Sequence, residues 1–235
     1  MNANEDCKFF IGYQVQSLHV HGNILIKTVL PGESRSWMHL EWCHVEGCPK
    51  LHTLFPAHEH EFFESIRIFF ASDLPMAYCI WGRSIFHHSS SFEGLQHIYL
   101  HNCPRLVFVL PISSFSLPHL ESIQIAHCSN IQHIFPLNDE CPREIASQVT
   151  FKKLKHIKLY HLHKLEQICE TSLITILALE TISLKDCWGL RRLAVLSRED
   201  RLGWDGSKAN HEPSLFKTCH SAYYKKTLTR VSALR

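Results

Sequence analysis

A pattern of apolar residues recurs along the chain about every 25 residues, and it constrains the fold more than any other feature of the sequence. In the clearest copy, apolar or Cys side chains stand 0, 3, 5, 8, 11 and 14 residues after the start, Leu95. One such unit cannot bury its own apolar side chains, so neighbouring units must stack on one another. The pattern predicts seven units, which begin at Val15, Leu40, Phe63, Leu95, Leu120, Leu154 and Leu179.

Each unit is expected to contain a short β-strand followed by a turn. Positions 3 and 5 alternate as the buried face of a strand does, so positions 2, 4 and 6 point the other way. The turn comes at position 8, where Cys103 and Cys128 stand and where unit one has Asn23. Small side chains there can donate a hydrogen bond to the backbone of the adjacent turn. The pattern therefore predicts a parallel sheet with strands near Ile98–Leu100, Ile123–Ile125, Ile157–Leu159 and Ile182–Leu184.

The unit resembles the leucine-rich repeat, in the C-x-x-L form seen at Cys103-Pro104-Arg105-Leu106. That form, closed by Phe-Pro at Phe55-Pro56, is similar to the repeats of plant intracellular nucleotide-binding leucine-rich-repeat disease-resistance proteins. The resemblance implies an α/β solenoid, a horseshoe of about seven repeats with a parallel concave sheet. It divides the chain into a short N-terminal segment, residues 1–14, leucine-rich repeats over 15–196, and a C-terminal cap or tail over 197–235.

The resemblance also implies a function and a location. It indicates a protein-recognition module of a cytoplasmic defence receptor, whose partner is a pathogen effector, a host target or the receptor's own nucleotide-binding module. The alternative is the substrate-binding arm of an F-box-like ubiquitin ligase, since those proteins carry similar Cys-rich repeats. No G-x-x-x-x-G-K-[ST] motif is present, so the family's nucleotide-binding module is expected to be missing from this chain.

Composition excludes several classes of protein. With 24 basic and 22 acidic residues the net charge is only +2, which argues against a nucleic-acid binder. No apolar run is long enough to span a membrane, and no secretory signal is recognisable at the N-terminus. The ten Cys residues are therefore expected to be reduced rather than paired in disulfides.

The 19 His and 10 Cys residues invite a catalytic or metal-binding interpretation, which the repeat argues against. The sequence His58-Glu59-His60-Glu61 is not H-E-x-x-H, because Phe62 occupies the last position. The Cys residues at position 8 are explained by burial, whereas a reactive thiol needs an exposed, electropositive setting. We therefore expect no enzyme activity, no cofactor and no bound metal.

The outward strand positions are the candidate binding surface. An ordinary solvated sheet face is the simpler interpretation, but aromatic residues and Arg are the types on which protein interfaces depend. Arg67 and Lys158 favour an acidic partner, and seven strands spaced about 4.8 Å apart span roughly 29 Å, which suits a protein. The candidate partner-binding residues are His19, Trp42, His44, Arg67, Phe69, His97, Tyr99, His101, Gln124, Lys158, Tyr160 and Lys185.

Overall fold

The computed structural model describes seven stretches of the chain, and all of them lie in the first of its two compact parts, Met1–Trp204. The predicted N-terminal segment, the C-terminal cap or tail and the His58–Glu61 sequence lie outside the described residues. The described residues are 15–29, 39–55, 63–81, 92–109, 117–136, 149–169 and 174–190.

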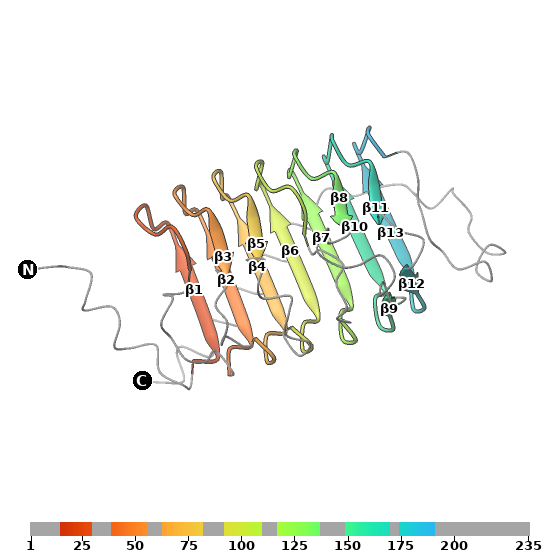
Figure 1. Cartoon of the computed structure of the whole chain (residues 1–235), viewed down its shortest axis with the longest axis horizontal. Coiled ribbons are helices and arrows are strands. Elements are labelled where there is room, and N and C mark those ends of the chain that lie inside the picture. Colours follow the sequence, from red (N-terminus) through yellow and green to blue (C-terminus); the bar gives the residue numbers. More distant parts are fainter. Residues whose placement is uncertain are drawn as a thin grey trace, which may run out of the picture. The chain divides into compact units, whose positions relative to one another are not determined.

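A seven-stranded parallel sheet organises this part of the chain, as the repeat predicts (Figure 1). Its strands follow one another in chain order, each hydrogen-bonded to the strand of the next unit, so that Ile98 pairs with Ile123. The strands are β1 (Ser17–His21), β2 (Trp42–Glu46), β4 (Ile68–Ser72), β6 (His97–His101), β7 (Ser122–Ala126), β10 (His156–Tyr160) and β13 (Thr181–Lys185).

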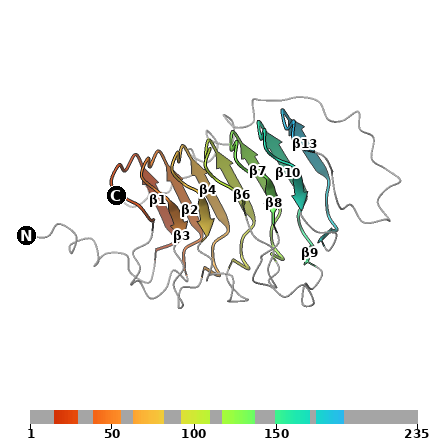
Figure 2. The ribbon, with the colours of Figure 1, turned by 45° about the horizontal axis from the view of Figure 1, so that its top comes forward.

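Shorter strands form three two-stranded parallel sheets behind the long one (Figure 2). The chain therefore coils as a parallel β-solenoid, as expected of stacked units. No helix occurs among the described residues, so this part of the chain does not show the α/β class that we predicted. The short pairs are β3 (Thr53–Phe55) with β5 (Cys79–Trp81), β8 (His133–Phe135) with β11 (Gln167–Cys169), and β9 (Val149–Phe151) with β12 (Ile174–Ile176).

The repeated apolar positions make one continuous core inside the coil. In the unit that begins at Leu95 all six of them are buried, from Leu95 itself to Val109. Equivalent residues of neighbouring units lie side by side, because strand pairing places Ile98 between Phe69 and Ile123. The end units are less complete: Leu18 in β1 and Ile182 in β13 pack against the core but are only partly buried.

Each long strand is followed by a residue in the left-handed backbone region, which turns the chain away from the sheet. After β1 and β2 this residue is glycine, which adopts a positive φ without steric cost. After the other strands it is Asp, Asn or His, the types that tolerate this conformation best among residues with a side chain. The full set is Gly22, Gly47, Asp73, Asn102, His127, His161 and Asp186.

Cys103 and Cys128 are buried free thiols, as predicted, and Cys187 at the equivalent turn is a free thiol that is only partly buried. Cys128 Sγ donates to the carbonyl oxygen of Ala126 at 3.4 Å in its own unit, and the backbone of Cys103 at the adjacent turn also interacts with the thiol. Cys187 Sγ lies 3.5 Å from the carbonyl oxygen of Lys185 in its own unit, and it also reaches the neighbouring unit at Leu159 O, 3.5 Å away. The turn thiols therefore contact the backbone of their own turn and also that of the adjacent unit.

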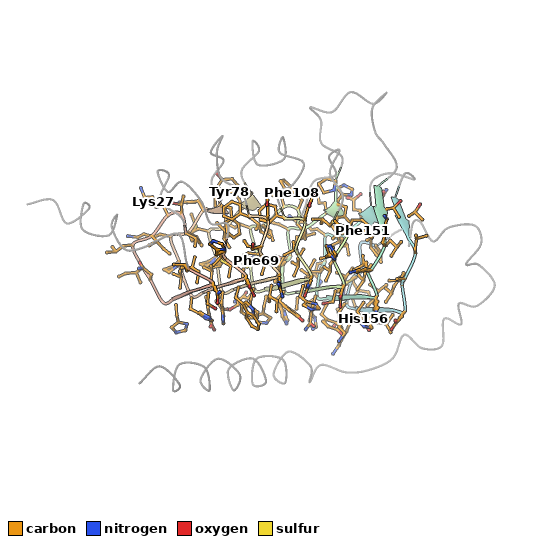
Figure 3. The ribbon with its side chains drawn as sticks, turned by 90° about the horizontal axis from the view of Figure 1, so that it is seen from below. Lys27, Phe69, Tyr78, Phe108, Phe151 and His156 are labelled. Carbon is orange, nitrogen blue, oxygen red and sulfur yellow. The ribbon has the colours of Figure 1, made fainter. Side chains whose placement is uncertain are left out.

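Unit three is shifted by three residues from the predicted alignment. Strand pairing aligns Phe69 with Cys43, so Ile66 rather than Phe63 occupies the first position of the unit. The prediction that Phe69 faces outward is wrong: its side chain is fully buried, and Figure 3 shows it between the two sides of the coil. Apolar residues three apart recur throughout this segment, and therefore both alignments satisfy the hydrophobic pattern.

Candidate functional site

The outward side chains of the seven long strands form one surface, which we call the sheet face. Three rows of side chains cross it, because every strand pairs with its neighbour in register. His156 marks this side of the molecule in Figure 3, and Tyr78 lies on the opposite side. The middle row is His19, His44, Phe70, Tyr99, Gln124, Lys158 and Ser183.

Aromatic rings follow the middle row over β1, β2, β4 and β6. The ring centres of His19 and His44 lie 5.6 Å apart. The rings of His44 and Phe70 meet edge to face, with their centres 4.3 Å apart. The ring centre of Tyr99 lies 6.4 Å from that of Phe70 on the neighbouring strand. The ring of His97 stacks against that of Tyr99, with their centres 6.2 Å apart. This half of the sheet face is therefore a half-buried aromatic surface, of the kind that supplies contact area in protein interfaces.

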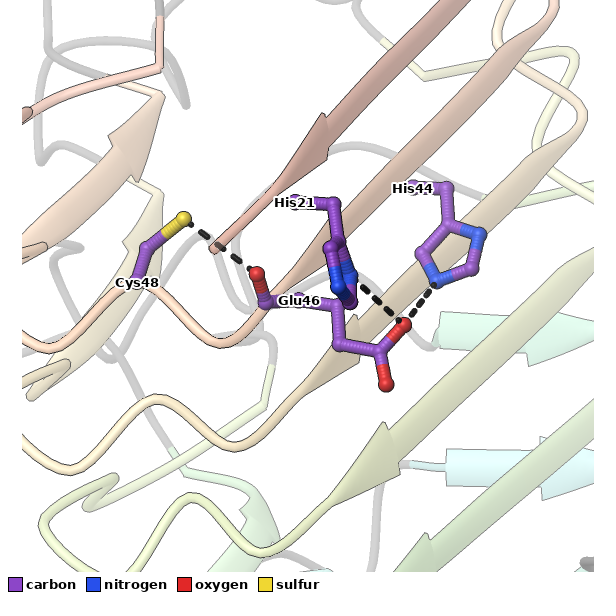
Figure 4. Close-up of polar contacts among 4 residues, drawn as sticks. All are labelled: His21, His44, Glu46 and Cys48. Atoms are coloured by element: carbon purple, nitrogen blue, oxygen red, sulfur yellow. Dashed lines mark hydrogen bonds and ion pairs between the residues drawn. The ribbon is translucent and has the colours of Figure 1, made fainter. Parts of the chain in front are cut away.

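Glu46 is held between two imidazoles at the end of β2 (Figure 4). One oxygen, Oε2, lies 3.4 Å from His21 Nδ1 and 3.4 Å from His44 Nε2. Each contact is an ion pair only when the imidazole is protonated, and Glu46 Oε2 makes no hydrogen bond within the described residues.

A second row of polar contacts runs along the first outward positions. His97 Nδ1 lies 2.8 Å from Ser122 Oγ, and His156 Nδ1 lies 2.9 Å from Thr181 Oγ1. Burial lowers the pKa of His97 below its ordinary value, although the nearby carboxylate of Glu121 acts in the opposite direction. His97 is thus kept neutral, with its ring available for stacking and hydrogen bonding.

The half of the sheet face over β7, β10 and β13 is polar and basic. Gln124 is only 3% exposed although it points outward, and its Nε2 has no hydrogen-bond partner. Lys158 stands beside it in register, and Lys185 follows one strand further along. Burial raises the pKa of the Tyr160 hydroxyl, which therefore stays protonated.

Histidines also line the turns at the end of the sheet. The ring of His127 lies 5.3 Å from that of His101 and stacks on that of His161 at 4.4 Å. His161 Nδ1 is 3.1 Å from Asp186 Oδ2. Partial burial lowers the pKa of His127, and the neighbouring imidazoles of His161 and His101 lower it further.

The sheet face brings together all the predicted site residues except Phe69, which is buried, and Arg67. Arg67 precedes β4 and is exposed, so it lies outside the middle row. Its Nε is 3.9 Å from Glu41 Oε2, so its charge is paired. The other predicted residues lie outward on the long strands, and their role in binding stays a prediction. They are His19, Trp42, His44, His97, Tyr99, His101, Gln124, Lys158, Tyr160 and Lys185.

Three outward residues of β4, Ile68, Phe70 and Ser72, were missed because of the shift in unit three. Asp73 carried the signal that would have placed them. It occupies the left-handed position that follows each strand, like Gly47 and Asn102 in the neighbouring units. Aligning the units on the Gly, Asn or Asp residue at that position determines where the strand lies, which the apolar pattern alone does not.

The site offers recognition chemistry rather than a reactive group. Burial raises the pKa of the Cys43 thiol to about 12 and that of Cys128 well above its ordinary range, so both stay protonated. Among the described residues, no three His, Cys, Asp or Glu side chains are placed to hold a metal ion. The same residues contain no helix that is long and apolar enough to cross a membrane.

Comparison with known proteins gives one family match. A family model described as plant disease resistance protein RPS2-like, leucine-rich repeats, matches residues 72–203, more than half of the chain. The matched residues contain β6, β7, β10 and β13 complete, and with them the polar and basic half of the sheet face. No solved structure matches the chain.

Proposed function

The chain belongs to the RPS2-like leucine-rich-repeat family of plant disease-resistance proteins, and on that basis we propose that it is the protein-recognition module of a plant immune receptor. Leucine-rich repeats of this family mediate protein interactions, which fits a face of half-buried rings rather than a catalytic centre. The family match carries the proposal. It also favours the disease-resistance interpretation over the F-box alternative.

In this proposal the sheet face is the binding surface, each of the seven long strands marks one repeat, and the module acts in the cytoplasm. The partner is a pathogen effector, a host target or the nucleotide-binding module of the same receptor. A surface that extends over seven strands suits a folded or extended protein better than a small metabolite, which prefers an enclosed pocket.

Two tyrosines on opposite sides of the coil provide a matched test. Tyr99 lies on the sheet face next to Phe70, whereas Tyr78 is exposed on the other side. We expect Tyr99→Ala to weaken partner binding by about 1–3 kcal/mol and Tyr78→Ala to leave it unchanged. Pairwise binding to candidate effectors and nucleotide-binding modules, with defence-associated cell death in leaves as the cellular readout, measures both.

Thermal unfolding of the two variants is the control, because each removes a side chain from the surface of the coil. Equal melting temperatures with a selective loss of binding in Tyr99→Ala support the proposal. Loss of recognition in Tyr78→Ala, with Tyr99→Ala unaffected, would place the binding surface on the opposite side.

A further inference from the structure

The charges of the sheet face are not balanced within it. Its outward positions include one carboxylate, Glu46, which lies at the end of β2 with two imidazoles 3.4 Å away. They also include two ammonium groups, Lys158 and Lys185, on the adjacent strands β10 and β13. Within the described part of the chain, no hydrogen bond or ion pair engages either ammonium group. The positive charge of the sheet face is therefore confined to one end, on strands that are not neighbours of β2.

Gln124 adds an unpaired hydrogen-bond donor at the same place. Its side chain is buried on β7, only 3% exposed, directly beside Lys158 in strand register, and its Nε2 finds no acceptor. A buried N–H without an acceptor is unfavourable, and such groups in folded proteins usually find a partner. An anionic oxygen can accept a hydrogen bond from the amide N–H and from the ammonium group, and it also balances the positive charge.

We propose that the β7–β13 half of the sheet face binds a carboxylate side chain of an extended protein segment, through Lys158, Lys185 and Gln124. The proposal deepens the recognition function proposed above and rests on it. The carboxylate accepts hydrogen bonds from the Gln124 amide and from the Lys158 ammonium group, which stand side by side in strand register. Lys185 adds a second positive charge one strand further along.

The aromatic half of the sheet face sets the rest of the partner's chemistry. Phe70 on β4 packs between His44 and Tyr99, and none of these three side chains is a carboxylate or an ammonium group. From β4 to β10 there are three strand spacings, which amount to about 14 Å. An extended chain covers that distance in about four residues. The partner segment therefore has an apolar or aromatic residue about four positions from its acidic residue.

Selection from a displayed library of random linear peptides tests the carboxylate site, because the library itself supplies the candidate segments. The full chain is the bait, and the charge-reversed variant Lys158→Glu/Lys185→Glu is compared with Lys152→Glu/Lys153→Glu. The control changes two exposed lysines in the turn before β10 by the same charge. We expect peptides rich in Asp and Glu that bind the charge-reversed variant at least about tenfold more weakly and the control variant equally well. The charge-reversed variant in turn selects Lys and Arg.

The outcomes separate this inference from the function on which it rests. Peptides that depend on Tyr99 but are not acidic, and that ignore the charge reversal, overturn the carboxylate site and leave the recognition surface standing. Peptides that depend on neither Tyr99 nor the two lysines overturn both. Binding of a single-stranded oligonucleotide that the charge reversal abolishes, with no acidic peptide selected, also overturns the proposal. Circular dichroism checks folding, and Lys158→Gln/Lys185→Gln replaces the charge reversal if that variant does not fold.

Discussion

The two faces of the same strands follow different rules. On β6, Ile98 and Leu100 point into the coil, are fully buried, and have apolar counterparts in the neighbouring strands. Tyr99 points outward between them, and its counterparts along the middle row range from Phe70 to Lys158. Stacking constrains the inward residues, because every unit must fit the next one. The outward residues are free of that constraint, so they can differ from strand to strand and carry specificity.

The sharpest test of this comparison uses two adjacent phenylalanines on β4. Phe69 points inward and packs on Phe55 at 5.6 Å, whereas Phe70 points outward against His44. We expect Phe69→Ala to lower the free energy of unfolding by about 3–5 kcal/mol, because it leaves a cavity in the core. Phe70→Ala should cost about 1 kcal/mol, the value of a partly exposed aromatic contact. Urea unfolding followed by circular dichroism measures both.

Binding distinguishes the same pair in the opposite sense. Phe70→Ala should weaken recognition while the protein stays folded, because its ring belongs to the aromatic row of the sheet face. If Phe70→Ala destabilises the fold more than Phe69→Ala, the assignment of the two faces in unit three is wrong.

A smaller effect is expected inside the turns, at Cys128. Its thiol is fully buried and donates to Ala126 O, so Cys128→Leu loses the donor and forces extra volume into a packed turn. We expect that change to cost about 1–3 kcal/mol. Cys128→Asn should cost about 1 kcal/mol less than Cys128→Leu, because the amide keeps a hydrogen-bonding group.

Asn23 shows that a turn of this kind accepts an amide. Its Oδ1 accepts hydrogen bonds from the backbone N–H groups of Leu25 and Ile26, at 2.9 and 3.2 Å. Thermal unfolding of the two Cys128 variants makes the comparison. Equal melting temperatures, or a lower one for Asn, would contradict a hydrogen-bonding role for the thiol.

The apolar spacing was enough to predict the parallel sheet and the inward residues outside unit three. The resemblance of the repeat motifs to plant disease-resistance leucine-rich repeats is confirmed by the family match. The apolar spacing failed in unit three because hydrophobic spacing is periodic in itself: a segment with apolar residues three apart fits the repeat in more than one alignment. Asp73, a residue with no apolar character, resolves the choice through its positive φ. Turn conformation and hydrophobic pattern are thus independent constraints on the same strand.

The candidate site was less predictable than the core. The sequence identified which positions face outward, but exposure depends on the neighbouring strands. Gln124 faces outward and is nevertheless buried. Arg67 pairs with Glu41, its counterpart in the preceding unit, and the misalignment of unit three hid that relation. The division of the sheet face into an aromatic half and a basic half follows from strand register, which the repeat predicted for every unit except unit three.

The smallest expected effect is the dependence of stability on pH. It distinguishes the two faces, because the inward thiol does not titrate near neutral pH and the outward imidazoles do. The buried Cys43, with its pKa raised to about 12, does not ionise near neutral pH. On the outer surface, burial lowers the pKa values of His19, His97 and His127 below their ordinary value of 6.5. The unfolded chain therefore binds more protons than the folded one as pH falls below about 6.5. The free energy of unfolding should be constant above that pH and decline below it, down to the lowered folded-state pKa values.

Urea unfolding between about pH 8 and pH 5 measures this slope. His97→Gln keeps a hydrogen-bonding group beside Ser122 but cannot take up a proton, so it should make the decline shallower without changing stability much at the upper end. His97→Gln/His127→Gln should reduce the slope further, since the two rings lie on separate rows of contacts. A decline as steep in the double variant as in the original chain would mean that the pH dependence arises from groups other than the outward histidines.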